Sequence, residues 1–428
     1  MTARFPLVLA LFALAACAAP RVSDTSSSDP SGSSATPLPA ATATATPLSQ
    51  DIPASCTAPV DVVLWETQLW MILGNELAFA PNPCARYYVS IPPVACYPGD
   101  TLKLCPRAGG AAQAVRDLGP QFHAMAEFHW GSWSQYVAQT GTTWREAGLT
   151  FRQLMDDAGY DVDSGDLWEI NEFPSSVRAG IGAARANTEN AVRALDEGPA
   201  GSTRVKGTVF IIGMGESTSN LSVYKPTIKR WLNDTTFWSA MNSHVRFFAQ
   251  EVYADPMHTC VPGSSVATRS RSVNDYAEHL GSLAAVAPSS AATARAYLKH
   301  AYVPLLNAAW NQPAAIGFGE TRVSIPTMKK FVSLETYAAR AWGASHLVPG
   351  RRIGYAWAPK NSDGLADADY KASLDDLAYR MAQSVRDAYD PASGTAAKAC
   401  SPAGSAGECA CSVSGATFNT AWSTFSSY

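Results

Sequence analysis

The sequence has no excess of positive charge, since 32 Lys and Arg stand against 36 Asp and Glu and the net charge is −4. Without a basic stripe, a nucleic-acid partner is not expected. No apolar run reaches the roughly 20 residues needed to cross a bilayer. The sequence also lacks the Gly-x-Ser-x-Gly elbow of serine hydrolases and the His-Glu-x-x-His of zinc proteases. These absences argue against both hydrolase classes, and no cofactor and no metal are expected.

A short basic and apolar segment opens the chain. Arg4 is followed by the apolar run Phe5–Leu14, which is typical of a secretory signal peptide. The Leu14-Ala15-Ala16-Cys17 run resembles the lipobox of bacterial lipoproteins. That resemblance implies removal of residues 1–16, acylation of Cys17 and a location on a cell membrane, outside the cytoplasm. The alternative is an ordinary secreted protein that is cut within residues 16–19.

The segment after Cys17 is poor in large apolar residues. Residues 17–54 are mostly Ser, Thr, Ala, Pro and Asp, so they bury too little surface to fold and are expected to form a disordered tether. The remaining 428 − 54 = 374 residues include many apolar and aromatic side chains, enough for a large core. We expect a barrel domain over 55–389, a Gly/Ser/Ala-rich extension over 390–428, and a monomer.

The chain has nine cysteines. If Cys17 carries lipid, eight remain, and an even number in an exported chain indicates disulfides. Cys96 and Cys105 flank a short turn and are the favoured local pair. Cys400, Cys409 and Cys411 are expected to link the C-terminal extension to the domain. A metal site is the alternative, but neither a Cys-x-x-Cys nor a His pair at ligand spacing supports it.

A strand–helix alternation begins near residue 60. Short apolar runs rich in β-branched and aromatic residues alternate with amphipathic stretches at helical spacing. The predicted strands are Asp61–Glu66, Arg86–Pro92, Phe122–His129, Asp166–Glu172, Gly207–Gly213, His244–Glu251, Ala314–Glu320 and Arg352–Trp357. The predicted helices are Thr142–Gly159, Ser175–Glu197, Lys225–Met241, Ala291–Trp310, Thr327–Leu347 and Leu365–Tyr389, with a weaker one over 67–80.

Eight such units favour an α/β fold of the closed (β/α)₈ TIM-barrel type over an open doubly wound sheet. An open sheet would normally carry a Gly-rich phosphate loop after its first strand, and none is present.

The predicted strands end in carboxylates and aromatic residues. In such barrels, the active site lies at the C-terminal ends of the strands. The residues at these ends are Trp65, Glu127, His129, Glu169, Asn171, Glu172, Glu251, Tyr253, Glu320 and Trp357. Aromatic faces and carboxylates together suit sugars, and hydrolysis of a glycosidic bond needs two carboxyl groups.

Asn171-Glu172 on the fourth predicted strand and Glu320 on the seventh resemble clan A of the retaining glycoside hydrolases. The resemblance implies that Glu172 is the acid/base, that Glu320 is the nucleophile and that Asn171 holds the sugar's 2-hydroxyl. It also implies substrate contacts for His129, Tyr253 and Trp357. Its specific part covers only these few residues, and no particular family within the clan is assigned.

Other roles for these residues stay open. The two glutamates could form ion pairs with Arg178, Arg322, Arg351 or Arg352, and Glu251 is the main rival for the nucleophile because it ends an equally convincing strand. Trp65 and Trp357 could be core residues instead of sugar platforms. Strand alternation predicts that if Glu172 points into the mouth, Glu169 faces the helices.

Three functions therefore compete. The first is a surface-anchored glycoside hydrolase acting on an oligo- or polysaccharide of the envelope or the environment. The second is a non-catalytic glycan-binding lipoprotein on the same scaffold. The third is a structural envelope protein, which only the C-terminal extension supports.

Overall fold

The computed structural model describes residues 56, 59–65, 82–173, 175–211, 230–252, 291–308, 311–312, 321–322, 325–356 and 367–389. All of them belong to the unit Ala45–Tyr428. Parallel strands close a barrel in the order β1-β10-β7-β6-β5-β4-β3-β2, which confirms the predicted fold. The barrel strands are β1 (Val60–Leu64), β2 (Ala85–Ile91), β3 (Phe122–His129), β4 (Leu167–Phe173), β5 (Gly207–Ile211), β6 (Val245–Val252), β7 (Tyr302–Asn307) and β10 (Arg352–Ala356).

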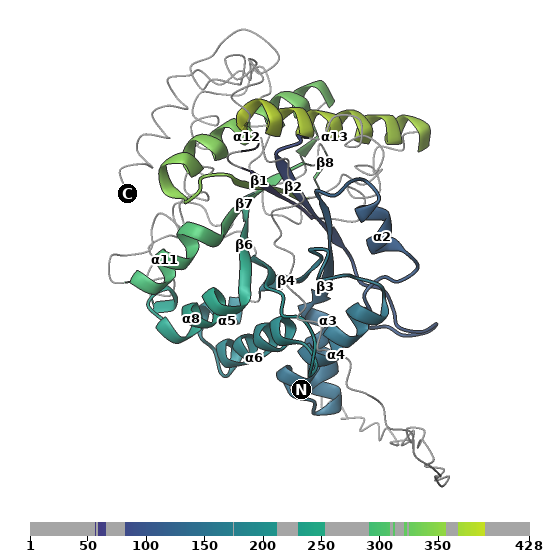
Figure 1. Cartoon of the computed structure of the whole chain (residues 1–428), viewed down its shortest axis with the longest axis vertical. Coiled ribbons are helices and arrows are strands. Elements are labelled where there is room, and N and C mark those ends of the chain that lie inside the picture. Colours follow the sequence, from purple (N-terminus) through teal and green to yellow (C-terminus); the bar gives the residue numbers. More distant parts are fainter. Residues whose placement is uncertain are drawn as a thin grey trace, which may run out of the picture. The chain divides into compact units, whose positions relative to one another are not determined.

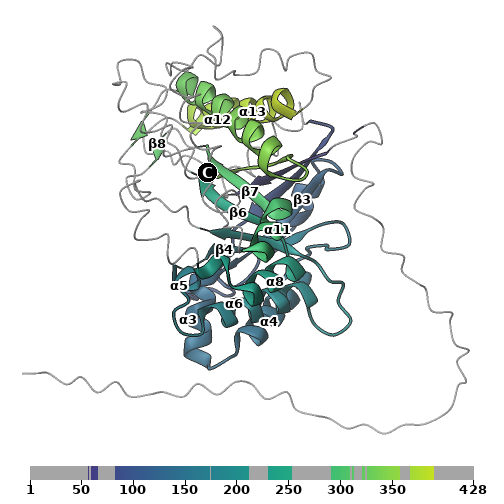
Figure 2. The same ribbon diagram turned by 90° about the vertical axis from the view of Figure 1, so that its left-hand side faces the viewer.

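Helices surround these strands (Figure 1). They are α2 (Ala111–Arg116), α3 (Trp130–Thr140), α4 (Trp144–Asp157), α5 (Ser175–Ala179), α6 (Ala184–Glu197), α8 (Thr235–His244), α11 (Ala292–Ala301), α12 (Ile325–His346) and α13 (Asp367–Tyr389). Seen from the side, α12 and α13 lie on one side of the strands and α4, α6 and α8 on the other (Figure 2). No helix in the described part of the chain is long and apolar enough to span a bilayer.

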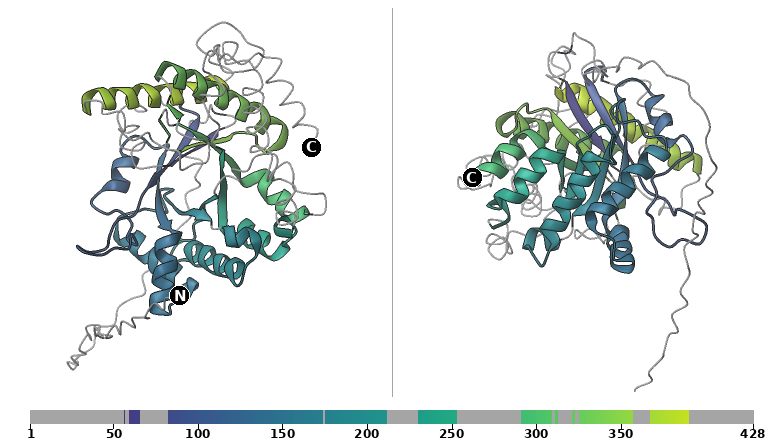
Figure 3. Two further views of the ribbon diagram at one scale, coloured as in Figure 1. Left: turned by 180° about the vertical axis from the view of Figure 1, so that it is seen from behind. Right: turned by 60° about the horizontal axis from the view of Figure 1, so that its bottom comes forward.

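Two hydrophobic clusters follow from the alternation of side chains along the strands. The larger one fills the layer between strands and helices. The smaller one fills the barrel interior and consists of Val63, Trp65, Tyr88, Met125, Leu167, Phe210, Phe247, Ala249, Val303, Leu305 and Ala356. Interior side chains of alternate strands meet, as where the Thr208 hydroxyl of β5 lies 3.4 Å from the Met125 sulfur of β3. Figure 3 shows the strands and the helices around them from behind and with the bottom turned forward.

The seventh barrel strand is not the one predicted. It is β7 (Tyr302–Asn307), which pairs with β6 and β10, whereas Ala314–Glu320 was expected. The expected helix over 291–310 ends at Ala301, where buried Tyr302 begins the strand. A short apolar run such as YVPLLN is compatible with either structure, and only its pairing with neighbours decides. Residues 313–320 lie outside the described residues, next to the two-residue strands β8 (Asn311–Gln312) and β9 (Thr321–Arg322).

Glycines divide another predicted helix. The stretch Ser175–Glu197 forms two helices, α5 and α6, because Gly180 and Gly182 between them have φ of 67° and 55°. Only glycine adopts such angles without strain, so the helix stops there. By contrast, the predicted helix over 142–159 is confirmed as α4, where Thr143 and Glu146 form a reciprocal capping box. Helices α2 and α3 were not predicted.

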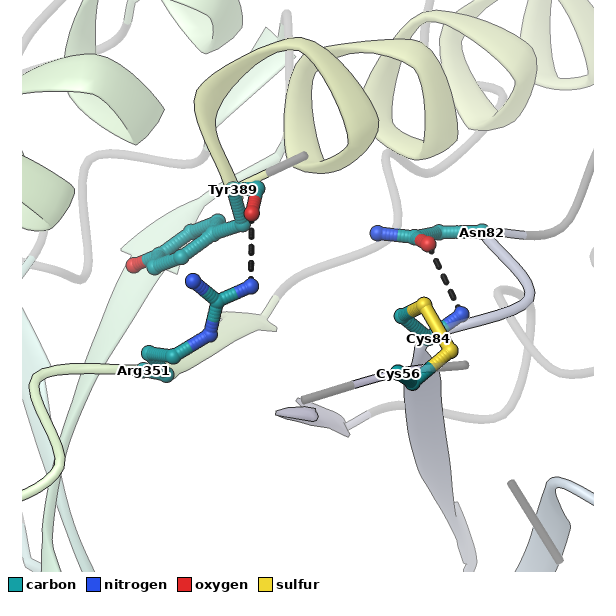
Figure 4. Close-up of a disulfide and its surroundings, with 5 residues drawn as sticks. All are labelled: Cys56, Asn82, Cys84, Arg351 and Tyr389. Atoms are coloured by element: carbon teal, nitrogen blue, oxygen red, sulfur yellow. Dashed lines mark hydrogen bonds between the residues drawn. A yellow bond between two sulfur atoms is a disulfide. The ribbon is translucent and has the colours of Figure 1, made fainter. Parts of the chain in front are cut away.

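Two disulfides tie loops to the barrel. Cys96–Cys105 confirms the predicted local pair and spans nine positions in sequence. Cys56–Cys84, with a separation of 28, attaches the segment before β1 to the start of β2. Figure 4 shows this bridge, with the Cys84 backbone N–H donating to Asn82 Oδ1 at 2.9 Å. Cys17, Cys260, Cys400, Cys409 and Cys411 lie outside the described residues.

Gly207 of β5 packs directly against Trp168 of β4. A Cβ at this position would lie 2.2 Å from both the backbone oxygen and the ring of Trp168, which is fully buried. We expect Gly207→Ala to lower the free energy of unfolding by about 3 kcal/mol, because neither the strand nor the indole can yield cheaply. Urea unfolding followed by circular dichroism measures this. Gly343→Ala is the control, since its Cβ would meet nothing closer than 3.4 Å in helix α12; equal losses in both variants would contradict the prediction.

His123 is a buried imidazole in the N-terminal half of β3. It stacks on Tyr88 with ring centroids 5.2 Å apart, and its Nδ1 lies 3.1 Å from the Ser164 carbonyl. Burial, together with the positive charges of Arg246 and Arg86, lowers the pKa of His123 to about 4. The folded protein therefore keeps this imidazole neutral at pH values where the unfolded chain protonates it.

This shift predicts a pH-dependent stability. His123 contributes nothing above its unfolded pKa of about 6.5, and it destabilises the fold by up to about 3 kcal/mol as the pH falls to 4. We expect His123→Phe, which retains a ring against Tyr88, to flatten the fall in stability between pH 6.5 and 4. Urea midpoints at pH 7, 6, 5 and 4 test this. Parallel curves for the parent and the variant would show that His123 does not titrate as described.

Candidate functional site

A buried amide–carboxylate contact marks the C-terminal ends of β3 and β4. Asn171 donates its Nδ2 hydrogen to Glu127 Oε1 at 3.1 Å, and the two residues are 7% and 4% exposed. Glu127 lies two residues after the interior residue Met125 on β3, so it belongs to the inner face of the barrel as well. The Asn171 Oδ1 is buried and has no hydrogen-bond partner among the described residues. Asn171 is thus held at the barrel mouth, and its buried acceptor atom is left unsatisfied by the described residues.

A second carboxylate lies in the interior below this contact. Glu169 of β4 is fully buried and accepts a hydrogen bond from the Ser90 hydroxyl of β2. Its register partner on β3 is Glu127, so two carboxylates occupy neighbouring inward positions. Glu169 thus faces the barrel interior, whereas the sequence predicted that it faces the helices on the condition that Glu172 points into the mouth. That prediction assumed an uninterrupted alternation along β4.

The alternation is interrupted at the end of β4. Ile170 pairs with Val209 and Phe173 pairs with Ile211, so Asn171 and Glu172 together stand opposite one residue of β5. This is a β-bulge, which bends a strand locally and re-aims its side chains. At a bulge, the side chains of two consecutive residues can lie on the same face of the sheet, whereas in a regular strand they lie on opposite faces. Strict alternation counted from Glu169 therefore does not decide the side of the sheet on which position 172 stands.

Glu172 and Glu251 are placed by their strands. Glu172 lies within β4, one residue before its end. Glu251 lies in β6, in register with the interior residue Leu305 and two residues after the interior residue Ala249. Its position therefore belongs to the inward-facing series of β6, close to the mouth. β4 and β6 are separated by β5 alone.

Two further candidates have well-defined surroundings. His129 ends β3 and caps helix α3, with its Nδ1 accepting from the Ser132 N–H at 3.1 Å. This hydrogen bond fixes the imidazole at the rim of the barrel. Trp65, directly after β1, is 5% exposed and lies 5.9 Å from the Phe210 ring in the interior cluster. Trp65 is thus part of the interior core, and contact with a sugar stays a prediction.

The remaining candidates fall outside the described residues: Glu320, Tyr253, Trp357 and Cys17. Because the seventh strand is β7, Glu320 does not end it, and the residue follows the end of that strand by 13 positions (320 − 307). Its assignment from the strand pattern is therefore corrected, while its chemical role stays a prediction.

Two of the arginines that could have neutralised the glutamates are engaged elsewhere. The Arg352 guanidinium donates to the carbonyls of Tyr302 at 3.1 Å and Lys299 at 2.9 Å, at the N-terminal end of the barrel. Arg351 donates to the Tyr389 carbonyl at 2.6 Å, at the end of α13 (Figure 4). Both cations hold carbonyls at the end of the barrel opposite the mouth. Among the residues that the structure describes, no group of three His, Cys, Asp or Glu side chains could hold a metal ion.

No protein-family model and no curated protein matches the chain. Solved structures that resemble it include an endo-β-N-acetylglucosaminidase from Cordyceps militaris, with 12% identity, a TM-score of 0.37, and coverage of 75% of this chain and 90% of that one. A chitinase from Chromobacterium violaceum shows 12% identity, a TM-score of 0.36, and coverage of 75% and 99%. An endoglucanase from an uncultured bacterium shows 15% identity, a TM-score of 0.38, and coverage of 74% and 84%. Likeness at this level transfers no activity to this chain.

The structure adds residues that the strand-end search did not single out as a site. Ser90 and the Glu127–Asn171 contact were missed as a unit, because the pairing depends on register between strands. The sequence did carry a signal: Glu127 and His129 are two residues apart, as are Glu169 and Asn171, so each pair lies on one face of its strand. This signal places polar residues in the interior of two adjacent strands, where apolar side chains are the rule.

Proposed function

We propose that the chain is a glycoside hydrolase that cleaves an oligo- or polysaccharide at the barrel mouth, with Glu172 as the acid/base. One observation carries the proposal: buried Asn171, held by Glu127, directly precedes Glu172 in the bulge that ends β4. Carboxylates on an inward face of a barrel mouth suit a reaction that needs paired carboxyl groups. The buried carboxylates of Glu127 and Glu169 add polar groups to the barrel interior next to Asn171.

In the proposed reaction, Glu172 donates a proton to the leaving glycosidic oxygen. A second carboxylate attacks the anomeric carbon and forms a glycosyl ester, and water then hydrolyses this ester while Glu172 removes the proton of that water. Asn171 would bind the sugar hydroxyl next to the anomeric carbon through its buried Oδ1. The second carboxylate is Glu320, from the clan resemblance, or Glu251, from its position on β6.

The test is the release of reducing ends from a panel of polysaccharides by the purified chain. Glu320→Gln and Glu251→Gln are then compared on the substrate that the parent cleaves. We expect one of the two variants to lose turnover by several orders of magnitude and the other to retain most of it. Full turnover in both variants would contradict the double-displacement mechanism. If the parent cleaves no polysaccharide, the proposed function is wrong.

We also propose that the chain is anchored to a membrane through lipid on Cys17. The support is the Leu14–Cys17 run at the end of a short apolar segment. Acyl chains contribute about 0.8 kcal/mol per buried methylene, so a multiply acylated cysteine holds a protein firmly. We expect the parent in the membrane fraction and Cys17→Ser in the soluble fraction after cell disruption. Equal membrane association of both would contradict lipid anchoring at this residue.

A further inference from the structure

A groove lies between the disulfide-bonded segment that follows β2 and the helices α3 and α4. Its volume is about 470 Å³, within the range of roughly 300–1,000 Å³ typical of small-molecule sites. The residues that matter for its chemistry are Tyr97, Asp100, Trp133, Tyr136, Gln139 and Thr140. None of them belongs to the proposed catalytic machinery.

Three aromatic residues contribute to this groove. Tyr97 is 65% exposed, which is unusual for a side chain of its size among the described residues. Trp133 is 1% exposed and meets Tyr136 edge to face, with ring centroids 5.4 Å apart. The exposed Tyr97 ring beside the groove offers a flat apolar face to a ligand, and the tyrosine hydroxyl can form a hydrogen bond.

The segment that carries Tyr97 is held rigidly. Cys96 is bonded to Cys105, and the Asp100 carboxylate accepts hydrogen bonds from the Cys96 N–H at 3.2 Å and the Leu102 N–H at 2.9 Å. Val94 and Cys105 also form a backbone bridge. Ordering a flexible loop costs binding free energy, so a tyrosine on a fixed loop binds with a smaller entropic loss.

Trp133 provides an independent sign of a missing partner. Its Nε1–H is buried and has no acceptor among the described residues. Buried indole N–H groups usually find a hydrogen-bond partner. Trp133 lines the groove, so this unsatisfied donor belongs to a residue of the groove wall.

The polar lining defines the class of ligand. Among the described residues that line the groove, none is Lys, Arg or His, and Asp100 is the one with a carboxylate. This lining disfavours an anionic ligand. Gln139, Thr101 and Thr140 supply donors and acceptors without charge. Aromatic faces next to uncharged hydrogen-bonding groups match a neutral sugar, which has apolar C–H faces and hydroxyl groups at its edges.

We propose that this groove binds a neutral oligosaccharide segment, with Tyr97 as the stacking platform. It would be a binding site additional to the barrel mouth, and the choice of a sugar as ligand rests on the proposed function. The walls of the groove follow β2 and β3, two strands that end at the mouth, so the groove could hold part of a polysaccharide whose cleavage occurs there.

The test is calorimetric titration of the full chain carrying Glu172→Gln, so that the ligand stays intact. The probes are neutral β-1,4-linked hexasaccharides of glucose, xylose, mannose and N-acetylglucosamine. We expect at least one probe to bind. Adding Tyr97→Ala should remove one binding site or raise its Kd at least about tenfold, whereas Tyr97→Phe, which retains the ring, should stay within about threefold of the Glu172→Gln chain.

The outcomes separate this proposal from the catalytic one. Tyr97-dependent binding, combined with no cleavage of any polysaccharide by the parent chain, would support the groove as a sugar site and contradict the proposed enzyme. If no probe binds, or if Tyr97→Ala leaves every binding isotherm unchanged, the groove is not a sugar site. Breaking the Cys96–Cys105 bond with Cys96→Ser/Cys105→Ser should weaken binding in the same direction as Tyr97→Ala, and tighter binding would contradict the role of a rigid loop.

Discussion

Glu172→Gln is expected to lower kcat about 10²- to 10⁴-fold on a polysaccharide that the parent cleaves. The amide cannot protonate the leaving oxygen, yet it fits the same position in the β4 bulge. Substrate binding should change far less than turnover, because the sugar contacts assigned to Asn171 remain. Initial rates of reducing-end release over a range of substrate concentrations separate kcat from KM.

The leaving group makes this prediction specific to acid catalysis. An aryl glycoside with an acidic phenol needs little protonation, so its glycosylation step should be much less impaired in Glu172→Gln than that of the natural substrate. Glu197→Gln is the matched control, since Glu197 lies on α6 in a partly exposed ion pair with Arg145 at 3.1 Å. The assignment fails if Glu172→Gln keeps full turnover, or if both classes of substrate lose the same factor.

Removing the Cys56–Cys84 bridge should destabilise the barrel by about 3–4 kcal/mol, by the loop-entropy relation for a separation of 28 residues. The bridge connects the segment before β1 to the residue directly before β2, and β1 closes the barrel against β10. The variant Cys56→Ala/Cys84→Ala should therefore unfold at lower urea concentration and lower temperature than the parent.

The second disulfide supplies the comparison. Cys96–Cys105 spans only nine positions, so Cys96→Ala/Cys105→Ala should cost about 2–3 kcal/mol. The loop that Cys96–Cys105 closes lies outside the pairings of the barrel strands. Loss of this bond should therefore leave the unfolding transition of the barrel closer to that of the parent. A larger loss from the shorter bridge would contradict an entropic origin for the stabilisation.

The barrel could be predicted from the sequence because most strands are short, apolar and separated by helices. The predicted strand Phe122–His129 coincides with β3, and the helix predicted over 142–159 corresponds to α4 (Trp144–Asp157). The seventh strand was misplaced because YVPLLN can continue a helix or begin a strand, and pairing with β6 decides. Gly180 and Gly182 were the overlooked signal for the break between α5 and α6.

The candidate site was predictable in its residue types but not in its register. Glu127, Glu169 and Asn171 stand out in the sequence as polar residues within apolar strands. That Asn171 bonds to Glu127, and that Ser90 bonds to Glu169, depends on how neighbouring strands are staggered. The bulge after Ile170 has no marker in the sequence, since its residues carry neither a Gly nor a Pro.

The most direct test of the paired-carboxylate account is a crystal structure in which the carboxyl carbons of Glu172, Glu251 and Glu320 are resolved. We predict that one of the two partner carboxyls lies about 5–5.5 Å from that of Glu172 across the mouth, as in a retaining hydrolase. A distance of about 6.5–9.5 Å would change the mechanism to inversion. Separations well beyond this range for both partners, with Glu172 turned toward the helices, would contradict hydrolysis at the barrel mouth.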